Sequence, residues 1–183
     1  MKADINLGPY IMDLLRRRNS PKLLDLELVA KGVQRSMEDY RQTGSYEDHV
    51  KFRSYVKCMH DGFQQLSLYF GKWKDFAGAY ITYSKANPNT RIKAKTIEWK
   101  MRMVAKQVKS NNLRFFTKDG KPTGINVSNP SPLPRWYARF QHTQTAYQIA
   151  ANSLSASLES TRNPERIPAH KKSIDGYCDW ILE

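Results

Sequence analysis

The chain has 183 residues, of which 40% are hydrophobic and 26% are charged. This balance is typical of a folded globular protein and is too apolar for an intrinsically disordered chain. The formal net charge of +13 is unusually high, and it favours a polyanionic partner, with nucleic acid ranked before an anionic membrane surface.

The positive charge is concentrated in one part of the chain. Residues 1–84 carry 13 Lys/Arg and 10 Asp/Glu, residues 85–121 carry 11 and 2, and residues 122–183 carry 6 and 5. About two-thirds of the excess charge therefore lies between residues 85 and 121. A charge that served only solubility would be spread more evenly, so the distribution indicates a localised anion-binding surface.

The amino-terminal region is predicted to be helical. A short helix is expected to begin at Pro9 and to end in three arginines at positions 16–18, which suit the helix dipole and anion binding equally well. Ser20-Pro21 is an N-cap and first-turn pair that begins a second helix, expected to end at Gly44. The apolar face of this second helix comprises Leu26, Val29, Val33, Met37 and Tyr40.

A capping-box pattern at Ser45 to Asp48 marks the start of the longest helical signal, which runs to the break at Pro88. Glycines at positions 62, 71 and 78 leave open whether the signal forms one kinked helix or two shorter ones. We interpret the aromatic residues on its apolar face as core, not as a platform for stacking bases. Nine apolar residues alternate at spacings of four and three: Phe52, Val56, Met59, Phe63, Leu66, Phe70, Trp73, Ala77 and Tyr80.

The segment from Lys95 to Ser110 divides into two faces when it is placed on a helix. One face carries Ile97, Met101, Val104 and Val108 and is expected to join the core, and the other carries Lys95, Trp99, Arg102, Lys106 and Lys109. We call this second set the basic stripe. Like charges one turn apart repel each other, so the stripe is explained if phosphates neutralise it. Trp99 either stacks on a base or packs beneath another helix.

Residues 113–127 are predicted to form a β-hairpin, with its turn at Asp119-Gly120. A helix followed by a basic hairpin is also the layout of a winged-helix DNA-binding protein. The helix has few side chains suited to base edges, Gln107 and Asn111 being the main ones, so contact with the phosphate backbone is favoured. Further basic residues expected on this surface are Lys93 before the stripe, Arg114, Lys118 and Lys121 in the hairpin, and Arg135 and Arg139 after it.

A further helix is expected to begin near Pro134, with an apolar face made of Phe140, Tyr147, Ala150, Leu154 and Leu158. Small residues between positions 150 and 157 predict close packing, which we assign to self-association or partner docking. Pro164 and Pro168 are expected to end this helix. The predicted organisation is one helical domain over residues 1–162 and a carboxyl-terminal docking extension over residues 163–183, with Ile174, Tyr177, Trp180 and Ile181 as its contacts.

The predicted fold class is therefore mainly α: a bundle of five or six helices with one inserted β-hairpin. Cys58 and Cys178 lie far apart and suggest no disulfide framework. No apolar signal core or run of transmembrane length is present. A reducing, cytoplasm-like compartment is expected, and this includes a viral or phage protein made there.

The sequence contains few signs of catalysis. Cys58 and His60 lie two residues apart without a second pair of metal ligands, and neither a phosphate-binding glycine loop nor a nucleophile elbow is present. We therefore expect a non-catalytic protein with no metal and no cofactor.

The leading hypothesis is a subunit that binds the backbone of RNA or single-stranded DNA within a larger nucleoprotein assembly, with self-association or other subunits as partners. Viral nucleoproteins, coat proteins and small helical subunits of RNA-guided complexes belong to this functional class, by analogy of architecture alone. One alternative is a winged-helix-type duplex DNA-binding protein of phage or plasmid replication or transcription. Another alternative is a matrix-like protein that lies on an anionic membrane. Such a protein needs apolar residues beside its cations to insert into the membrane, and the basic stripe has only Trp99 for this role.

Overall fold

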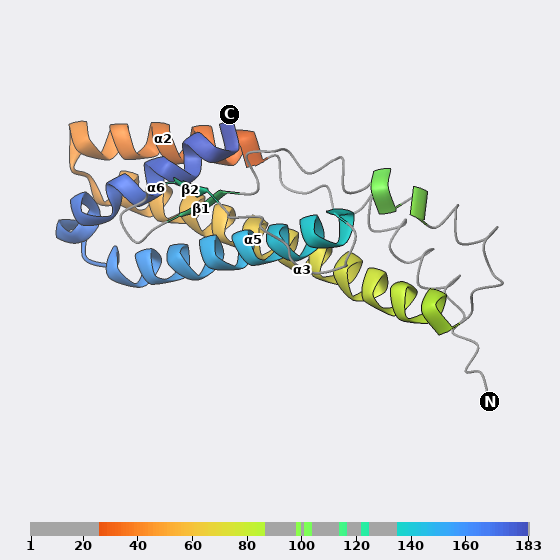
Figure 1. Cartoon of the computed structure of the whole chain (residues 1–183). Helices are drawn as coiled ribbons and strands as arrows, with labels where there is room; N and C mark the ends of the chain where they lie inside the picture. Colours follow the sequence, from red (N-terminus) through yellow and green to blue (C-terminus); the bar gives the residue numbers. More distant parts are fainter. Residues whose placement is uncertain are drawn as a thin grey trace.

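The computed structural model describes residues 26–86, 98–99, 101–103, 114–116, 122–124 and 135–182, and its fold is mainly α, as predicted. Residues 98–99 and 101–103 are helical as well. The named elements are α2 (Leu26–Thr43), α3 (Tyr46–Ala86), β1 (Arg114–Phe116), β2 (Pro122–Gly124), α5 (Arg135–Ser160), the short 3-10 helix η2 (Pro164–Arg166) and α6 (Ile167–Leu182). Together the helices form a bundle around α3 (Figure 1).

Helix α2 ends at Thr43, one residue before the predicted stop. Gly44 has a φ of 61°, and its N–H donates to the carbonyl of Tyr40 at 2.7 Å. This is the left-handed carboxyl cap that glycine adopts without a steric penalty. The predicted start of this helix at Ser20-Pro21 lies outside the described residues, as does the predicted helix before it.

The amino end of α3 is capped by Ser45, as the sequence pattern predicts. The N–H of Asp48 donates to Ser45 Oγ at 3.2 Å. The Asp48 carboxylate does not return to the backbone N–H of Ser45 but accepts from the hydroxyls of Thr43 and Ser45. These two hydrogen bonds, that of Thr43 first, lower the pKa of Asp48. The cap therefore also ties the end of α2 to the start of α3.

Helix α3 is one continuous helix of 41 residues, which settles the question of one helix or two. All nine predicted core positions are buried, each with 8% or less of its surface exposed. Two glycines in α3 lie where neighbouring helices approach closely. A Cβ at Gly62 would lie 2.6 Å from Leu26 Cδ2, and one at Gly71 would lie 2.7 Å from Gln144 Nε2. Packing across the bundle therefore explains these helix-weakening residues.

Helix α5 runs antiparallel to α3 (Figure 1). Early residues of α3 accordingly contact residues at or just after the end of α5, and later residues of α3 contact the middle of α5. Phe140, Tyr147, Ala150 and Leu154 are buried as predicted, and Leu158 is partly buried. The small residues Ala150, Ala151 and Ser157 are buried inside the bundle. This corrects their assignment to self-association, because they pack against the chain itself.

The prolines after α5 begin helices and do not end one, which corrects their predicted role. Helix α5 already ends at Ser160, and Pro164 is the first residue of η2, with Asn163 as its N-cap. Pro168 is the second residue of α6. Proline is tolerated in a first turn because the N–H it lacks has no partner within the helix there.

Helix α6 belongs to the same core as α2, α3 and α5. The ring of Phe63 in α3 lies 5.9 Å from that of Tyr177 and 5.4 Å from that of Trp180, both in α6. Both α6 side chains are buried. The expectation that these two side chains dock a partner is therefore wrong, because both are buried against other helices of this chain.

Strands β1 and β2 pair antiparallel, with Arg114 opposite Gly124. The predicted turn at Asp119-Gly120 and the rest of the 113–127 segment lie outside the described residues, so the complete hairpin stays a prediction. Within the part of the chain that the structure describes, no helix has the length and apolar character needed to span a membrane.

Candidate functional site

The described part of the basic stripe shows the two faces that the sequence predicts. Met101 is fully buried, whereas Trp99 is 60% exposed and Arg102 is exposed. Trp99 therefore does not pack beneath another helix, which was one of the two readings of this residue. Its indole plane and the Arg102 guanidinium are accessible from solvent.

The acidic residue of this segment helps to hold it against α3. Tyr80 of α3 donates through its hydroxyl to Glu98 Oε1 at 3.3 Å. Burial, together with the neighbouring Glu98 charge, raises the pKa of Tyr80, so this hydroxyl keeps its proton near neutral pH. Glu98 is thus engaged in packing the segment onto α3.

The first turns of α5 lie near the same end of α3. Gly78 lies two residues before Tyr80 in α3, and a Cβ at Gly78 would lie 3.8 Å from Cε2 of Tyr137 in α5. Arg139, one of the predicted site residues, is exposed on α5. Strand β1, which contains Arg114, also contacts α5. The segment around Glu98 and the first turns of α5, which carry Arg135 and Arg139, therefore lie near the carboxyl-terminal part of α3, whereas Figure 1 draws β1 and β2 away from that end.

The structure describes only the backbone, or no part, of the other predicted site residues. Arg114 and Arg135 are placed in β1 and α5 by their backbone, and their side chains are outside the described set. The predicted site residues that lie outside the described residues are Lys93, Lys95, Lys106, Lys109, Lys118 and Lys121.

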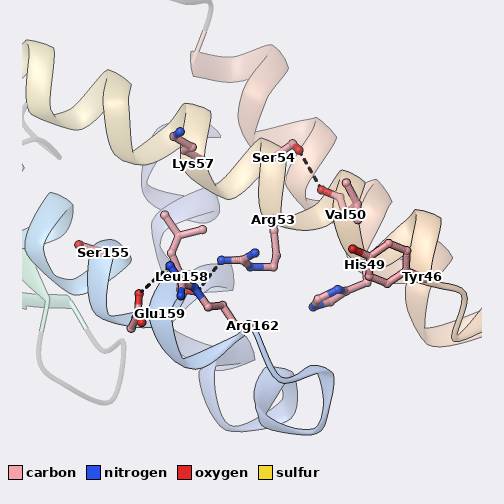
Figure 2. Close-up of a pocket in the computed structure, with 10 residues that line it drawn as sticks. All are labelled: Tyr46, His49, Val50, Arg53, Ser54, Lys57, Ser155, Leu158, Glu159 and Arg162. Carbon is pink, nitrogen blue, oxygen red and sulfur yellow. Dashed lines mark hydrogen bonds and ion pairs between the residues drawn. The ribbon is translucent and has the colours of Figure 1, made fainter.

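A second feature is a groove of about 450 Å³ between the first turns of α3 and the end of α5 (Figure 2). We call it the α3–α5 pocket. Three cationic side chains line it: Arg53 and Lys57 from α3, and Arg162 from the turn after α5. Its other lining residues are Tyr46, His49, Val50, Ser54, Ser155, Leu158 and Glu159.

Two side chains of the pocket connect α3 to the end of α5. Arg53 Nη2 donates to the carbonyl of Leu158 at 2.9 Å, and His49 Nε2 lies 2.9 Å from the carbonyl of Thr161. A carbonyl oxygen only accepts, so Nε2 of His49 carries the hydrogen. The last carbonyls of a helix have no partner within it, and α3 therefore supplies part of the carboxyl cap of α5.

The charge balance of the pocket is positive. Glu159 is the one acid among its lining residues and forms an ion pair with Arg162 at 3.4 Å. Both side chains are mostly exposed, so the pair is weak and its geometry is easily changed. Arg53 and Lys57 have no acidic residue beside them in the lining.

Two polar atoms in the wall of the pocket have no hydrogen-bond partner among the described residues: Nδ1 of His49 and Nε of Arg53. His49 is only 5% exposed. Leaving such atoms unpaired costs free energy, commonly about 1–3 kcal/mol for a buried group. Both atoms are covered, so a ligand reaches them only after a neighbouring side chain moves.

Sequence reasoning missed this pocket. His49, Arg53 and Lys57 follow one another at intervals of four residues, which places them on one face of a helix and is visible in the sequence. The opposite wall comes from residues 155–162, about a hundred positions later. Nothing local in the sequence relates those two segments.

Within the described residues, no group of three or more His, Cys, Asp or Glu side chains is arranged to hold a metal ion. No protein-family model, curated protein or solved structure matches this chain.

Proposed function

We propose that the chain is a non-catalytic nucleic-acid-binding protein that contacts the phosphate backbone of RNA or single-stranded DNA through the basic stripe. The observation that carries the proposal is the exposure of Trp99 and Arg102 on a helical segment whose Met101 is buried. This segment lies within residues 85–121, which hold 11 basic and 2 acidic residues.

An exposed tryptophan among cations suits a single strand. Stacking of a base on an aromatic side chain contributes roughly 1–3 kcal/mol, and it tolerates any base because each has a π-face. Cations beside it neutralise phosphates and release counterions, so binding weakens steeply with salt. A duplex backbone would use the cations but not the indole plane.

The surroundings of the stripe favour an extended binding surface. The segment around Glu98 and the first turns of α5 both lie near residues 78–80 of α3. Arg135 and Arg139 follow on α5. A strand that crossed this region would meet cations from two separate segments, the basic stripe and the start of α5.

The test compares wild type with a variant in which Lys95, Arg102, Lys106 and Lys109 are all changed to Gln. Binding to fluorescent single-stranded RNA, single-stranded DNA and random duplex, and to anionic vesicles, is measured across a salt series. For single strands the slope of log K against log salt should fall in size by about 0.7 for each phosphate that the variant no longer neutralises. Trp99→Ala should weaken single-strand binding about tenfold without changing that slope.

A matched control removes the same charge elsewhere, by changing Lys31, Arg35, Arg166 and Lys172 to Gln. All four are exposed on α2, η2 or α6, and this variant should bind within about threefold of wild type if the stripe is the site. Equal losses in the two variants would contradict the proposal. A clear preference for duplex would favour a winged-helix reader, and binding to vesicles alone would favour a membrane-surface protein.

A further inference from the structure

We propose that the α3–α5 pocket binds a phosphate monoester carried by a small organic group, such as a mononucleotide or the 5′-terminal phosphate of a strand. The inference rests on the pocket alone and does not depend on the proposed function of the basic stripe.

The size and charge of the pocket fit such a ligand. Its volume of about 450 Å³ lies within the range of small-molecule sites, roughly 300–1,000 Å³. Arg53, Lys57 and Arg162 line the pocket together with a single carboxylate, that of Glu159, which forms an exposed ion pair with Arg162. A dianion in the groove would therefore meet an excess of positive charge.

The donors in the pocket are of the kind that phosphate oxygens accept. Arg53 is held in place by its bond to the Leu158 carbonyl, which uses one of its five N–H groups. A guanidinium held in this way is preorganised for phosphate, and its flat fork matches two phosphate oxygens. Ser155 and Lys57 also line the pocket.

The pocket also has apolar walls for the organic part of the ligand. Tyr46, Val50 and Leu158 line it together with the cations. Tyr46 is 78% exposed, and its ring centroid lies 6.2 Å from that of His49, so its outer face is open to a bound base or sugar. Free inorganic phosphate would use the cations but not these walls, and it should bind more weakly than a nucleotide.

The pocket is separate from the basic stripe. Tyr80, which holds Glu98, lies 27 residues after Arg53 in the same continuous helix. At the rise of an α-helix this separation is about 40 Å. A small ligand cannot touch both places, so binding at the two sites can be measured independently.

The test records the Arg Nε–H and His ring-nitrogen NMR signals of the whole ¹⁵N-labelled chain during titration. AMP should shift the signals of Arg53 and His49, because both side chains line the pocket. Adenosine, which lacks the phosphate, and glutamate, which offers only carboxylates, should leave these signals unchanged. A short oligonucleotide with a 5′-phosphate, compared with the same one bearing a 5′-hydroxyl, separates the two sources of the phosphate.

The variant Lys57→Gln/Arg162→Gln removes two exposed cations and should weaken AMP binding about tenfold. Its matched control is Arg35→Gln/Lys85→Gln, which removes two exposed cations on α2 and at the end of α3 and should bind within about twofold of wild type. Unchanged thermal midpoints in both variants would show that the fold is intact.

Binding of AMP alone would support a free nucleotide as the ligand, and binding of the 5′-phosphorylated strand alone would support a strand end. Either result supports a phosphate monoester site. The proposal is overturned if neither shifts the Arg53 signal at up to about 10 mM, if adenosine or glutamate does so equally well, or if the two double variants lose equal affinity.

Discussion

Arg53 of α3 donates through Nη2 to the carbonyl oxygen of Leu158 near the end of α5, at 2.9 Å. The two residues are 105 positions apart in the chain. Together with the contact of His49 to Thr161, this bond closes the end of α5 with side chains from another helix. The pocket beside it therefore has a rigid wall, built by interactions that also stabilise the bundle.

Replacing Arg53 with Met should lower the free energy of unfolding by about 1–2 kcal/mol. The Leu158 carbonyl would lose its charged partner, while the aliphatic stem of the side chain would be kept. Urea denaturation measures the change. Lys57→Met, one turn later on the exposed side of α3, is the control and should change stability by less than about 0.5 kcal/mol. Equal effects would mean that the bond to Leu158 contributes nothing.

Two glycine substitutions should change stability in opposite directions. Gly78→Ala places a Cβ 3.8 Å from the Tyr137 ring, which is ordinary contact, so the gain in helix propensity should raise stability by about 0.5–1 kcal/mol. Gly44→Ala meets no neighbouring atom but sits at a φ of 61°, and it should lower stability by about 1 kcal/mol. Thermal unfolding of the two variants side by side measures both changes, and a loss of stability in Gly78→Ala or no loss in Gly44→Ala would contradict the prediction.

The centre of the core is predicted to be at Phe63, which is fully buried and contacts the rings of Tyr147, Tyr177 and Trp180. Phe63→Ala should cost about 3–5 kcal/mol, since it opens a cavity among three helices. Leu68→Ala on the same helix is the control, because Leu68 is 63% exposed and should lose less than about 0.5 kcal/mol. A small effect at Phe63 would show that α6 is not docked onto α3 as described.

Stability should fall in alkaline solution partly because of Cys178. Burial, and then the charges of Asp175 and Asp179, raise the pKa of this thiol to about 12. An unfolded cysteine has a pKa of about 8.5. Between these values the unfolded chain has lost the proton that the folded chain keeps, so stability decreases as pH rises, by about 1.4 kcal/mol per pH unit.

Cys178→Ala removes this contribution, and its plot of unfolding free energy against pH should be flatter than that of wild type between about pH 9.5 and 11. In the folded protein Cys178 should also react with iodoacetamide far more slowly than the partly exposed Cys58, because the thiolate is the nucleophile. Parallel pH profiles for the two proteins would count against the buried position of the thiol.

The basic stripe and the pocket differ in how visible they are in the sequence. At the stripe, the alternation of apolar and basic positions correctly predicts that Met101 is buried and that Arg102 is exposed, whereas it left open whether Trp99 is exposed or packs beneath another helix. At the pocket, the spacing of His49, Arg53 and Lys57 is equally regular. It has no evident meaning until residues 155–162 are brought beside it.

Local pattern was sufficient where the physical cause is itself local. The period of apolar residues in α3, the cap at Ser45 and the left-handed stop at Gly44 all depend on neighbours within one or two turns, and each was predicted from the sequence. The concentration of positive charge is also a property of the sequence alone.

Tertiary structure decided which surfaces are covered and which remain open. The small residues of α5 and the aromatic residues of α6 have the composition of a docking surface, yet they are buried within this chain. Apolar periodicity records that a face is buried but not what buries it. The pocket depends on side chains that meet across an antiparallel helix pair, and only the packing of α3 against α5 brings them together.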